Sequence, residues 1–473
     1  MNTPNENGII LHAAFSAWQA AATLRARRLR NKRFTYGDQW IDKTLDERGK
    51  EVTEWQLLYS KGRGAPITNN VLRQLVKTIV GRFRAIHLKE DENHRKSETN
   101  AIAESNSLNE LDSRLLEEFL ISGWAIQRID EDDLPEGGSE VKVSNVNLND
   151  FFINAITDPL ARDCEIIGQI HDFSVAELIK HVAQGSRKKA AWVRRLYSDG
   201  ADERTHQLQS AIGADTKSGT DFFYCKSNKC RAIEVWTLES QEVMVCHNHA
   251  TAQLFTVPVS QEKKMKANPD ITCHWDIATR WHCRWFSPMG DLLASYDSPF
   301  EHGSHPFTLK FYPLTDGEVH SFIEDVIDQQ KYINRLITLV DQIMSASAKG
   351  VLLYPLNALP DGFTWSDVLN IWSRSKGILP YNADNGMAKP EQMITDNSNI
   401  GAYDMLQLQM KLLEEISGVS GAMQGQSVNT SGSATLYQTQ ADNSVIALTD
   451  IFDTFNSFRR QRDNKIQHLH ANS

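Results

Sequence analysis

Cysteine and long hydrophobic runs are scarce in this chain. Its 473 residues include six cysteines, too few for a disulfide scaffold. No apolar run approaches the ~18–20 residues that span a bilayer. The N-terminal MNTPNENGIILHAAF also lacks a basic leader followed by a long apolar stretch. We therefore expect a protein without a membrane span that is made in a cytoplasm.

The motifs of common enzyme classes are also absent. The sequence has no G-x-x-x-x-G-K-S/T phosphate loop, no G-x-G-x-x-G opening a βαβ unit, no G-x-S-x-G elbow and no H-E-x-x-H. Acidic pairs such as Glu117–Glu118 are typical of solvated faces. We expect no enzyme and no cofactor. A DNA-processing enzyme built from scattered carboxylates remains the alternative.

A strongly basic character is missing too. The chain has 50 Lys and Arg against 60 Asp and Glu, a net charge of −10. Proteins that grip DNA tightly neutralise phosphates with basic domains, so this balance argues against a tight binder. It is compatible with a surface that DNA slides past.

What is present predicts a folded α+β protein of two or three domains. Helical patterns cover residues 9–33, 67–84 and 98–122, with Asn69 or Asn70 near the cap of the second helix. A mobile loop is expected over residues 183–222, and strand-like runs dominate residues 231–313.

A basic patch, RARRLRNKR from Arg25 to Arg33, closes the first helix. One interpretation is a solvated helix end, where the helix dipole favours cations. The other is a contact with nucleic acid or an acidic partner.

Cysteine and histidine gather between Cys225 and Cys283, which makes this region the best zinc candidate. The weak ligand candidates are Cys225, Cys230, Cys246 and His249. Their spacing fits no compact zinc finger, and neighbours such as Cys273 and His274 would point to opposite faces of a strand. We expect no metal and keep a zinc-stabilised binding module as an alternative.

The most informative stretch is a helix, an insert, a second helix and an uncharged loop. Residues 318–346 carry a broad apolar stripe, with polar residues such as Asn334 on the other face. The insert, 347–399, has strand-like pieces at Val351–Tyr354, Phe363–Trp365 and Gly377–Leu379 around a small helix. A helix over 400–417 ends at Gly418, and a last helix covers 434–468.

The loop at 418–433 contains no charged or aromatic residue, and its composition alone is typical of a flexible connector. Trp365, Trp372 and Tyr381 of the insert are candidates either for docking another protein or for core packing.

The order of these segments resembles the portal protein of tailed double-stranded DNA phages, nearest to the short-tailed type. The similar stretches are RARRLRNKRFTYGDQW, ITNNVLRQLVKTIVGRFR, WFSPMGDLLASYDSPFEHGSHPF, EDVIDQQKYINRLITLVDQIMSAS and SGVSGAMQGQ with SGSATLYQTQ, which cover most of the chain. Each is weak alone, and their order makes the resemblance specific.

The resemblance implies a portal fold: a wing over 1–317, stem helices over 318–346 and 400–417, a clip over 347–399, a tunnel loop over 418–433, and a long wing helix over 434–473. A C-terminal crown is expected to be missing or truncated. The tunnel loop would place a set of polar residues along the DNA channel: Gln424, Gln426, Ser427, Asn429, Thr430 and Ser431.

The resemblance further implies a twelve-subunit ring at one capsid vertex, assembled in the host cytoplasm and found in the virion. Double-stranded DNA would pass through it during packaging and ejection. The expected partners are the terminase large subunit, capsid and scaffolding proteins, and head-completion or tail adaptor proteins.

Overall fold

The structure is a computed structural model, and the chain forms two compact units. The first comprises Met1–Arg33, Gln74–Asp325 and Gly418–Ser473, and the second comprises Phe34–Arg73 and Val326–Ser417. The described residues are 4–60, 65–93, 98–133, 139–183, 185–197, 204–205, 208, 222–224, 229–300, 303–312, 314–347, 351–356, 358–373, 379–382, 390–393, 401–419 and 446–470.

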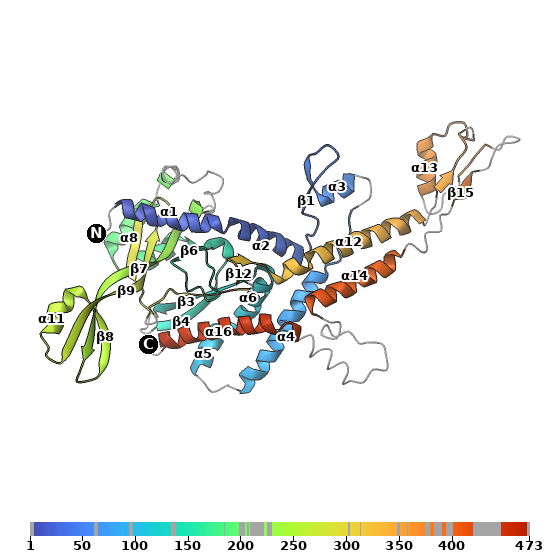
Figure 1. The fold of residues 1–473 in the computed structure, drawn as a ribbon. Helices are drawn as coiled ribbons and strands as arrows, with labels where there is room; N and C mark the ends of the chain where they lie inside the picture. The colour runs from blue at the N-terminus through green and yellow to red at the C-terminus, as the bar shows by residue number, and fades with distance from the viewer. Residues whose placement is uncertain are drawn as a thin grey trace. The chain divides into compact units, whose positions relative to one another are not determined.

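Two antiparallel sheets build the first unit (Figure 1). The larger sheet has the order β10-β9-β7-β6-β5, with β8 paired to β7. Its strands are β5 Phe151–Ile153, β6 Ile166–Phe173, β7 Cys230–Asn248, β8 Gln253–Pro258, β9 Ile271–Phe286 and β10 Leu292–Asp297. The smaller sheet has the order β11-β3-β4, from β3 Trp124–Asp133, β4 Ser139–Asn145 and β11 Phe307–Phe311. The predicted β-rich region and the α+β class are confirmed.

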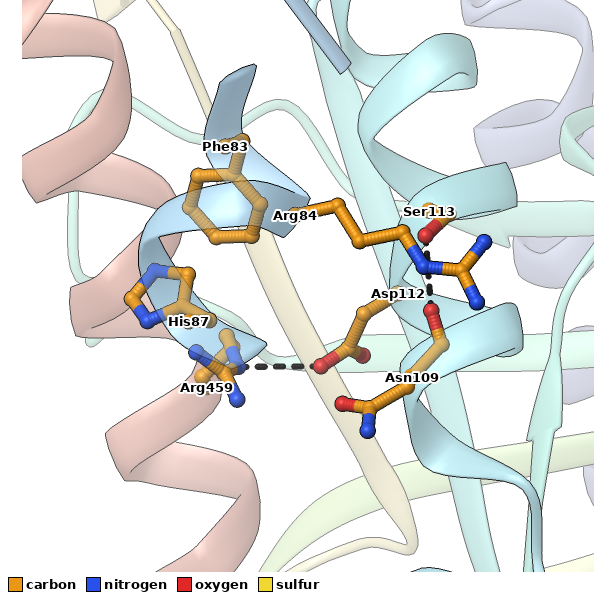
Figure 2. Close-up of a pocket in the computed structure, with 7 residues that line it drawn as sticks. All are labelled: Phe83, Arg84, His87, Asn109, Asp112, Ser113 and Arg459. Atoms are coloured by element: carbon orange, nitrogen blue, oxygen red, sulfur yellow. Dashed lines mark hydrogen bonds and ion pairs between the residues drawn. The ribbon is translucent and has the colours of Figure 1, made fainter. Parts of the chain in front are cut away.

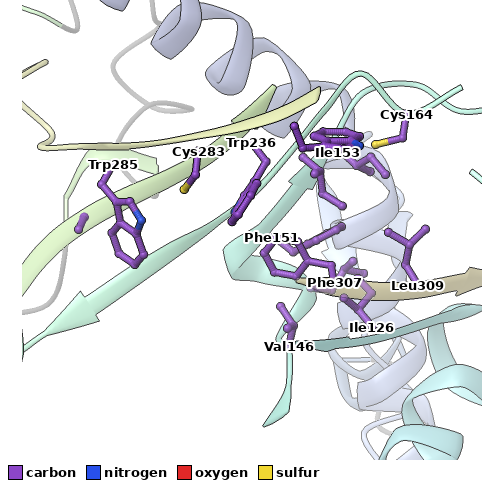
Figure 3. Close-up of a cluster of buried hydrophobic side chains, with 14 of the residues drawn as sticks. Ile126, Val146, Phe151, Ile153, Cys164, Trp236, Cys283, Trp285, Phe307 and Leu309 are labelled. Carbon is purple, nitrogen blue, oxygen red and sulfur yellow. The ribbon is translucent and has the colours of Figure 1, made fainter. Parts of the chain in front are cut away.

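The main hydrophobic core draws side chains from both sheets (Figure 3). Ile126 and Phe307 come from the smaller sheet, and Phe151, Trp236 and Trp285 come from the larger one. A second cluster places Phe15 and Trp18 of α1 (Pro4–Ala20) against other strand residues. Aromatic side chains bury large apolar areas, so these clusters supply much of the unit's stability.

The other helices of the first unit are α2 Ala22–Thr35, α4 Val71–Asn93, α5 Glu98–Ser105, α6 Leu108–Ser122, α7 Val175–Ala183, α8 Arg187–Leu196, α11 Glu262–Lys266 and α16 Thr449–His470. The last residues of α2, after Arg33, and the first residues of α4, before Gln74, belong to the second unit. Short 3-10 turns, η1 Leu148–Asp150 and η2 Val259–Gln261, and the small strands β12 Leu314–Thr315 and β13 Glu318–Val319 complete it.

Local capping follows the sequence. Asn70 accepts the backbone N–H of Arg73 at 3.2 Å, so the predicted cap of α4 is confirmed. Ser174 and Glu177 exchange hydrogen bonds at the start of α7, which forms a capping box. Gly123 ends α6 with φ of 75°, a left-handed conformation that favours glycine.

Three expectations about helices are wrong in detail. The segment 9–33 is broken at Ala21 into α1 and α2, and 98–122 is broken near Ser107, which has φ of 51°. Residues 183–222 are not all loop, because α8 lies within them. Val193 and Leu196 of α8 are buried, and this short apolar spacing was hidden among basic residues.

The second unit contains β1 Lys43–Leu45, β2 Glu51–Thr53, α3 Glu54–Ser60, most of α12 Phe322–Ser347, β14 Val351–Leu353, α13 Trp365–Ser373, β15 Glu391–Met393 and α14 Ala402–Ser417. The helix expected from 318 begins at Phe322, because Glu318 and Val319 pair with β12 as β13. Within the insert, Phe363–Trp365 is no strand, since α13 starts at Trp365. Gly377 lies outside the described residues.

Candidate functional site

The insert is closed by a small sheet at its base. β14 pairs with β15 in antiparallel register, with Val351 opposite Met393. Helix α12 ends at Ser347, shortly before β14, and α14 begins at Ala402, shortly after β15. The sheet therefore brings the end of α12 toward the start of α14. We define the tip as β14, β15 and the described residues between them, including α13 (Figure 1).

A buried polar ladder fixes α12 within the second unit. Gln330, Asn334 and Thr338 recur every four residues and are buried. Each accepts a backbone N–H from the segment before or at the start of α4. Gln330 accepts from Val71 at 3.1 Å, Asn334 from Asn69 at 2.9 Å and Thr338 from Ile67 at 3.0 Å. The ladder therefore supplies buried acceptors to the N–H groups of Ile67 and Asn69 and a second acceptor to Val71, whose N–H also lies 2.9 Å from the Asn69 oxygen.

Gln39 extends this ladder. Asn334 donates from Nδ2 to Gln39 Oε1 at 2.6 Å, and Gln39 in turn donates to the backbone oxygen of Phe34 at 2.8 Å. The sequence pattern assigned Asn334 to the polar outer face, and the structure corrects this. A period of four cannot distinguish a buried polar row from a solvated one, so sequence reasoning missed the ladder.

Ion pairs hold the neighbouring face of α12. Lys331 Nζ lies 2.6 Å from Asp42 and 3.1 Å from Glu54, and its side chain is only 15% exposed. Arg335 pairs with the same Glu54 at 3.0 Å. Partly buried pairs of this kind are screened less by salt than surface pairs, so they orient the helix as well as stabilise it.

The second helix, α14, is apolar but uncovered. Among its residues only Leu413 and Ser417 are buried. Tyr403 is 68% exposed and Leu408 is 49% exposed, and the other large exposed apolar side chains are Met405, Met410 and Ile416. Helices that are apolar on several sides are normally buried, so the exposed apolar side chains of α14 make it a candidate contact surface.

Exposed apolar side chains continue onto α12 and the tip. Tyr332, Leu339 and Met344 are exposed on α12. In the tip the exposed set is Leu353, Leu356, Trp365, Leu369 and Tyr381, whereas Trp372 is half-buried. Trp365 stacks edge-on with Tyr354 at 5.8 Å between ring centroids. Trp365 and Tyr381 are therefore exposed enough to contact another protein, whereas Trp372 is partly packed within the tip. We name the exposed apolar residues of α12, α14 and the tip the apolar surface.

A family model described as Phage P22-like portal protein matches residues 12–466. The chain belongs to the P22-like portal protein family. No curated protein matches it. Membership makes the chain a structural component of the bacteriophage virion, of the head–tail connector and packaging apparatus, in a family that forms oligomeric rings.

The predicted DNA-channel residues of this family member are not among the described residues. These residues, which lie within 420–445, are Gln424, Gln426, Ser427, Asn429, Thr430 and Ser431. The loop's first two residues are described. Gly418 has φ of 68°, which confirms it as the stop of α14, and Val419 is buried.

The basic patch is largely tied into the first unit. Arg25 lies over the Trp18 ring at 3.7 Å and donates to the backbone oxygen of Trp18. Arg28 is buried and forms a forked ion pair with Glu118. Arg27 donates to the backbone oxygen of Val319 at 3.0 Å. For these three cations a packing role replaces both sequence interpretations.

The three zinc candidates within the described ranges, Cys230, Cys246 and His249, do not come together. Cys230 lies opposite Phe173, and Cys246 lies opposite Cys273, whereas His249 contacts the Thr272 hydroxyl at 2.9 Å. Cys225 lies outside the described residues. Within the described ranges, no group of three His, Cys, Asp or Glu side chains is placed to hold a metal ion.

One small pocket of the first unit is lined by α4, α6 and α16 (Figure 2). Its carboxylate, Asp112, pairs with Arg459 at 2.9 Å and with the buried Arg462 on its other oxygen. A carboxylate held by two guanidinium groups is poorly suited to act as a base or nucleophile. The ion pairs that line this pocket therefore hold α16 against α6.

Among the described helices, none has the length and apolar character needed to cross a bilayer.

Proposed function

We propose that this chain forms a ring at one capsid vertex and that DNA passes through the ring during packaging and ejection. The observation that carries the proposal is the uncovered apolar helix α14 in a member of the portal family. A second copy of the chain is the occupant that a ring supplies, because each subunit then covers its neighbour's apolar surface.

The parts of the ring follow from the same proposal. α12 and α14 are the stem helices, and the tip is the clip. Residues 1–317 and 434–473 supply the wing, although the second compact unit also includes Phe34–Arg73. The exposed Trp365, Leu369 and Tyr381 of the tip suit docking of a packaging motor, the terminase large subunit. Capsid, scaffolding and head-completion or tail adaptor proteins are the remaining proposed partners.

A charge substitution on α14 tests ring formation. Leu408→Lys places a cation in the surface that a neighbouring subunit covers, so we expect monomers in negative-stain images and mass photometry, with an unchanged circular dichroism spectrum. Gln407→Lys adds the same charge at an exposed polar position and should retain rings near twelvefold. Monomers of the unchanged protein under assembly-permissive conditions would contradict the proposal.

The loop after Gly418 is proposed as the surface nearest to DNA. Its support is composition and position: residues 418–433 carry no charge, and they follow the second stem helix. An uncharged loop adds few phosphate contacts and so holds DNA weakly. Replacing Gln424–Thr430 by a short Gly-Ser link should leave rings intact and reduce DNA packaging or retention. Loss of rings would instead make the loop structural.

A further inference from the structure

An extension of the larger sheet, residues 243–276, has few packing partners, and we name it the outer arm. β6 pairs only with residues 230–237 of β7, and β10 pairs only with residues 282–286 of β9. Beyond those strands, β7 and β9 continue as a pair with β8, and α11 packs on β9 (Figure 1). Trp275 and Ile277 on and beside the arm are 54% exposed.

Two cysteines face each other across the outer arm. Cys246 of β7 is the direct partner of Cys273 of β9 in the antiparallel register. Directly opposite residues share one face of the sheet, with Cα atoms about 4.5–5.5 Å apart. That spacing falls within the ~4.4–6.8 Å that disulfides span, so bridging needs no backbone rearrangement. The two Sγ atoms already lie 2.7 Å apart.

The two thiols differ in access. Cys246 is fully buried, whereas Cys273 is half-buried and can be reached from solvent. Burial, with the Cys273 neighbour, raises the pKa of the Cys246 thiol to about 11. Because solvent reaches only Cys273 of the two, reaction with a soluble oxidant begins at Cys273.

We propose that Cys246 and Cys273 are a reversible disulfide site, oxidised by low-molecular-weight disulfides such as oxidised glutathione. The Cys273 thiolate attacks one sulfur of glutathione disulfide, forms a mixed disulfide and releases one glutathione. The Cys246 sulfur then attacks the Cys273 sulfur, and its proton passes to the second glutathione as that thiol leaves. Two protein thiols are oxidised while one small disulfide is reduced to two thiols.

The consequence is a covalent tie across an otherwise lightly supported strand pair. A disulfide from Cys246 to Cys273 closes a loop that contains β8 and α11. The disulfide lowers the conformational entropy of the opened arm more than that of the folded arm. The state of the pair then depends on the redox potential of its surroundings. Both cysteines remain thiols where glutathione is reduced, and they form the disulfide where glutathione is oxidised. This inference does not rest on ring formation.

Peptide mapping of the purified full chain tests the site. After incubation with oxidised glutathione, free thiols are alkylated in denaturant and the digest is analysed by mass spectrometry. We expect Cys246 and Cys273 in one linked peptide pair, which dithiothreitol separates. Full alkylation of both cysteines, a link between different chains, or a retained metal mass would overturn the proposal.

Single variants test the order of attack. Cys246→Ser should trap a glutathione adduct on Cys273, whereas Cys273→Ser should leave Cys246 unmodified. Cys164→Ser, which alters a buried core cysteine, should form the link as the unchanged chain does. Hydrogen exchange of arm amides should slow on the order of tenfold after oxidation, an effect lost in either single arm variant. Equal exchange in oxidised and reduced protein would contradict the tie.

Discussion

Glu234 is the most completely buried charge in the described part of the first unit's larger sheet. It pairs with Arg128 of the smaller sheet, lies 2.8 Å from His171 Nε2 and accepts the Trp236 indole N–H at 2.7 Å. Burial on its own raises the pKa of Glu234, but the charge of Arg128 and the His171 bond outweigh it, and the pKa falls to about 2. This one carboxylate therefore links two sheets.

The residue-scale prediction is an acid-sensitive first unit. The folded-state pKa of Glu234 lies below its ordinary value of 4.5, so its stabilisation is complete above about pH 4.5 and is lost as the pH falls toward 2. Glu234→Gln should lower the free energy of unfolding at pH 7 by about 3 kcal/mol, because the buried Arg128 then keeps only Asp130 as a counter-charge.

Chemical denaturation between pH 2 and 7 measures this effect. The variant should also lose part of the acid-induced decline that the unchanged chain shows. The control is Glu110→Gln, which removes an exposed pair with Arg114 and should cost less than about 1 kcal/mol. Equal losses for the two variants would show that Glu234 contributes no special stabilisation.

At the residue scale the sequence was informative where chemistry is local. The Asn70 cap and the Gly418 stop were readable because each involves residues within one helical turn. Partners more than one hundred positions apart, such as Arg128 and Glu234, leave no such local pattern.

At the scale of elements, α12 depends on its buried polar ladder. Asn334→Ala removes the acceptor for the Asn69 N–H and the donor to Gln39, so buried polar groups lose their partners. We expect a loss of about 1–3 kcal/mol in the free energy of unfolding of the second unit. Asp341→Ala, on an exposed position of the same helix, should change stability by less than about 0.5 kcal/mol.

Thermal and denaturant unfolding, followed by circular dichroism, compare these two variants. If Asn334→Ala is as stable as Asp341→Ala, the ladder adds nothing to the stability of the unit. Element prediction itself worked best for α12 and α14, whose long apolar periodicity was plain in the sequence. It failed at the breaks near Ala21 and Ser107, since neither proline nor glycine marks them.

At the scale of the whole molecule, net charge sets the expected behaviour toward DNA. A chain with a net charge of −10 should bind linear duplex DNA no more tightly than about 1 µM at physiological salt. Fluorescence anisotropy of a labelled duplex, titrated with assembled protein at 50 and 200 mM salt, measures this. Nanomolar binding that persists at 200 mM salt would contradict a passage past which DNA slides.

Fold class and family were accessible from the sequence because they depend on the order of many segments, and the family match confirms both. The division into units was not, because residues 34–73 precede and residues 326–417 follow most of the first unit. Periodicity along the chain carries no information on which distant segments pair.

The split origin of the second unit has a consequence for synthesis. The backbone N–H groups of Ile67, Asn69 and Val71 leave the ribosome long before their acceptors on α12 have been translated. At roughly 5–20 residues per second, the wait is on the order of tens of seconds. During that interval these N–H groups lack their acceptors on α12, so the second unit can complete its fold only late in translation.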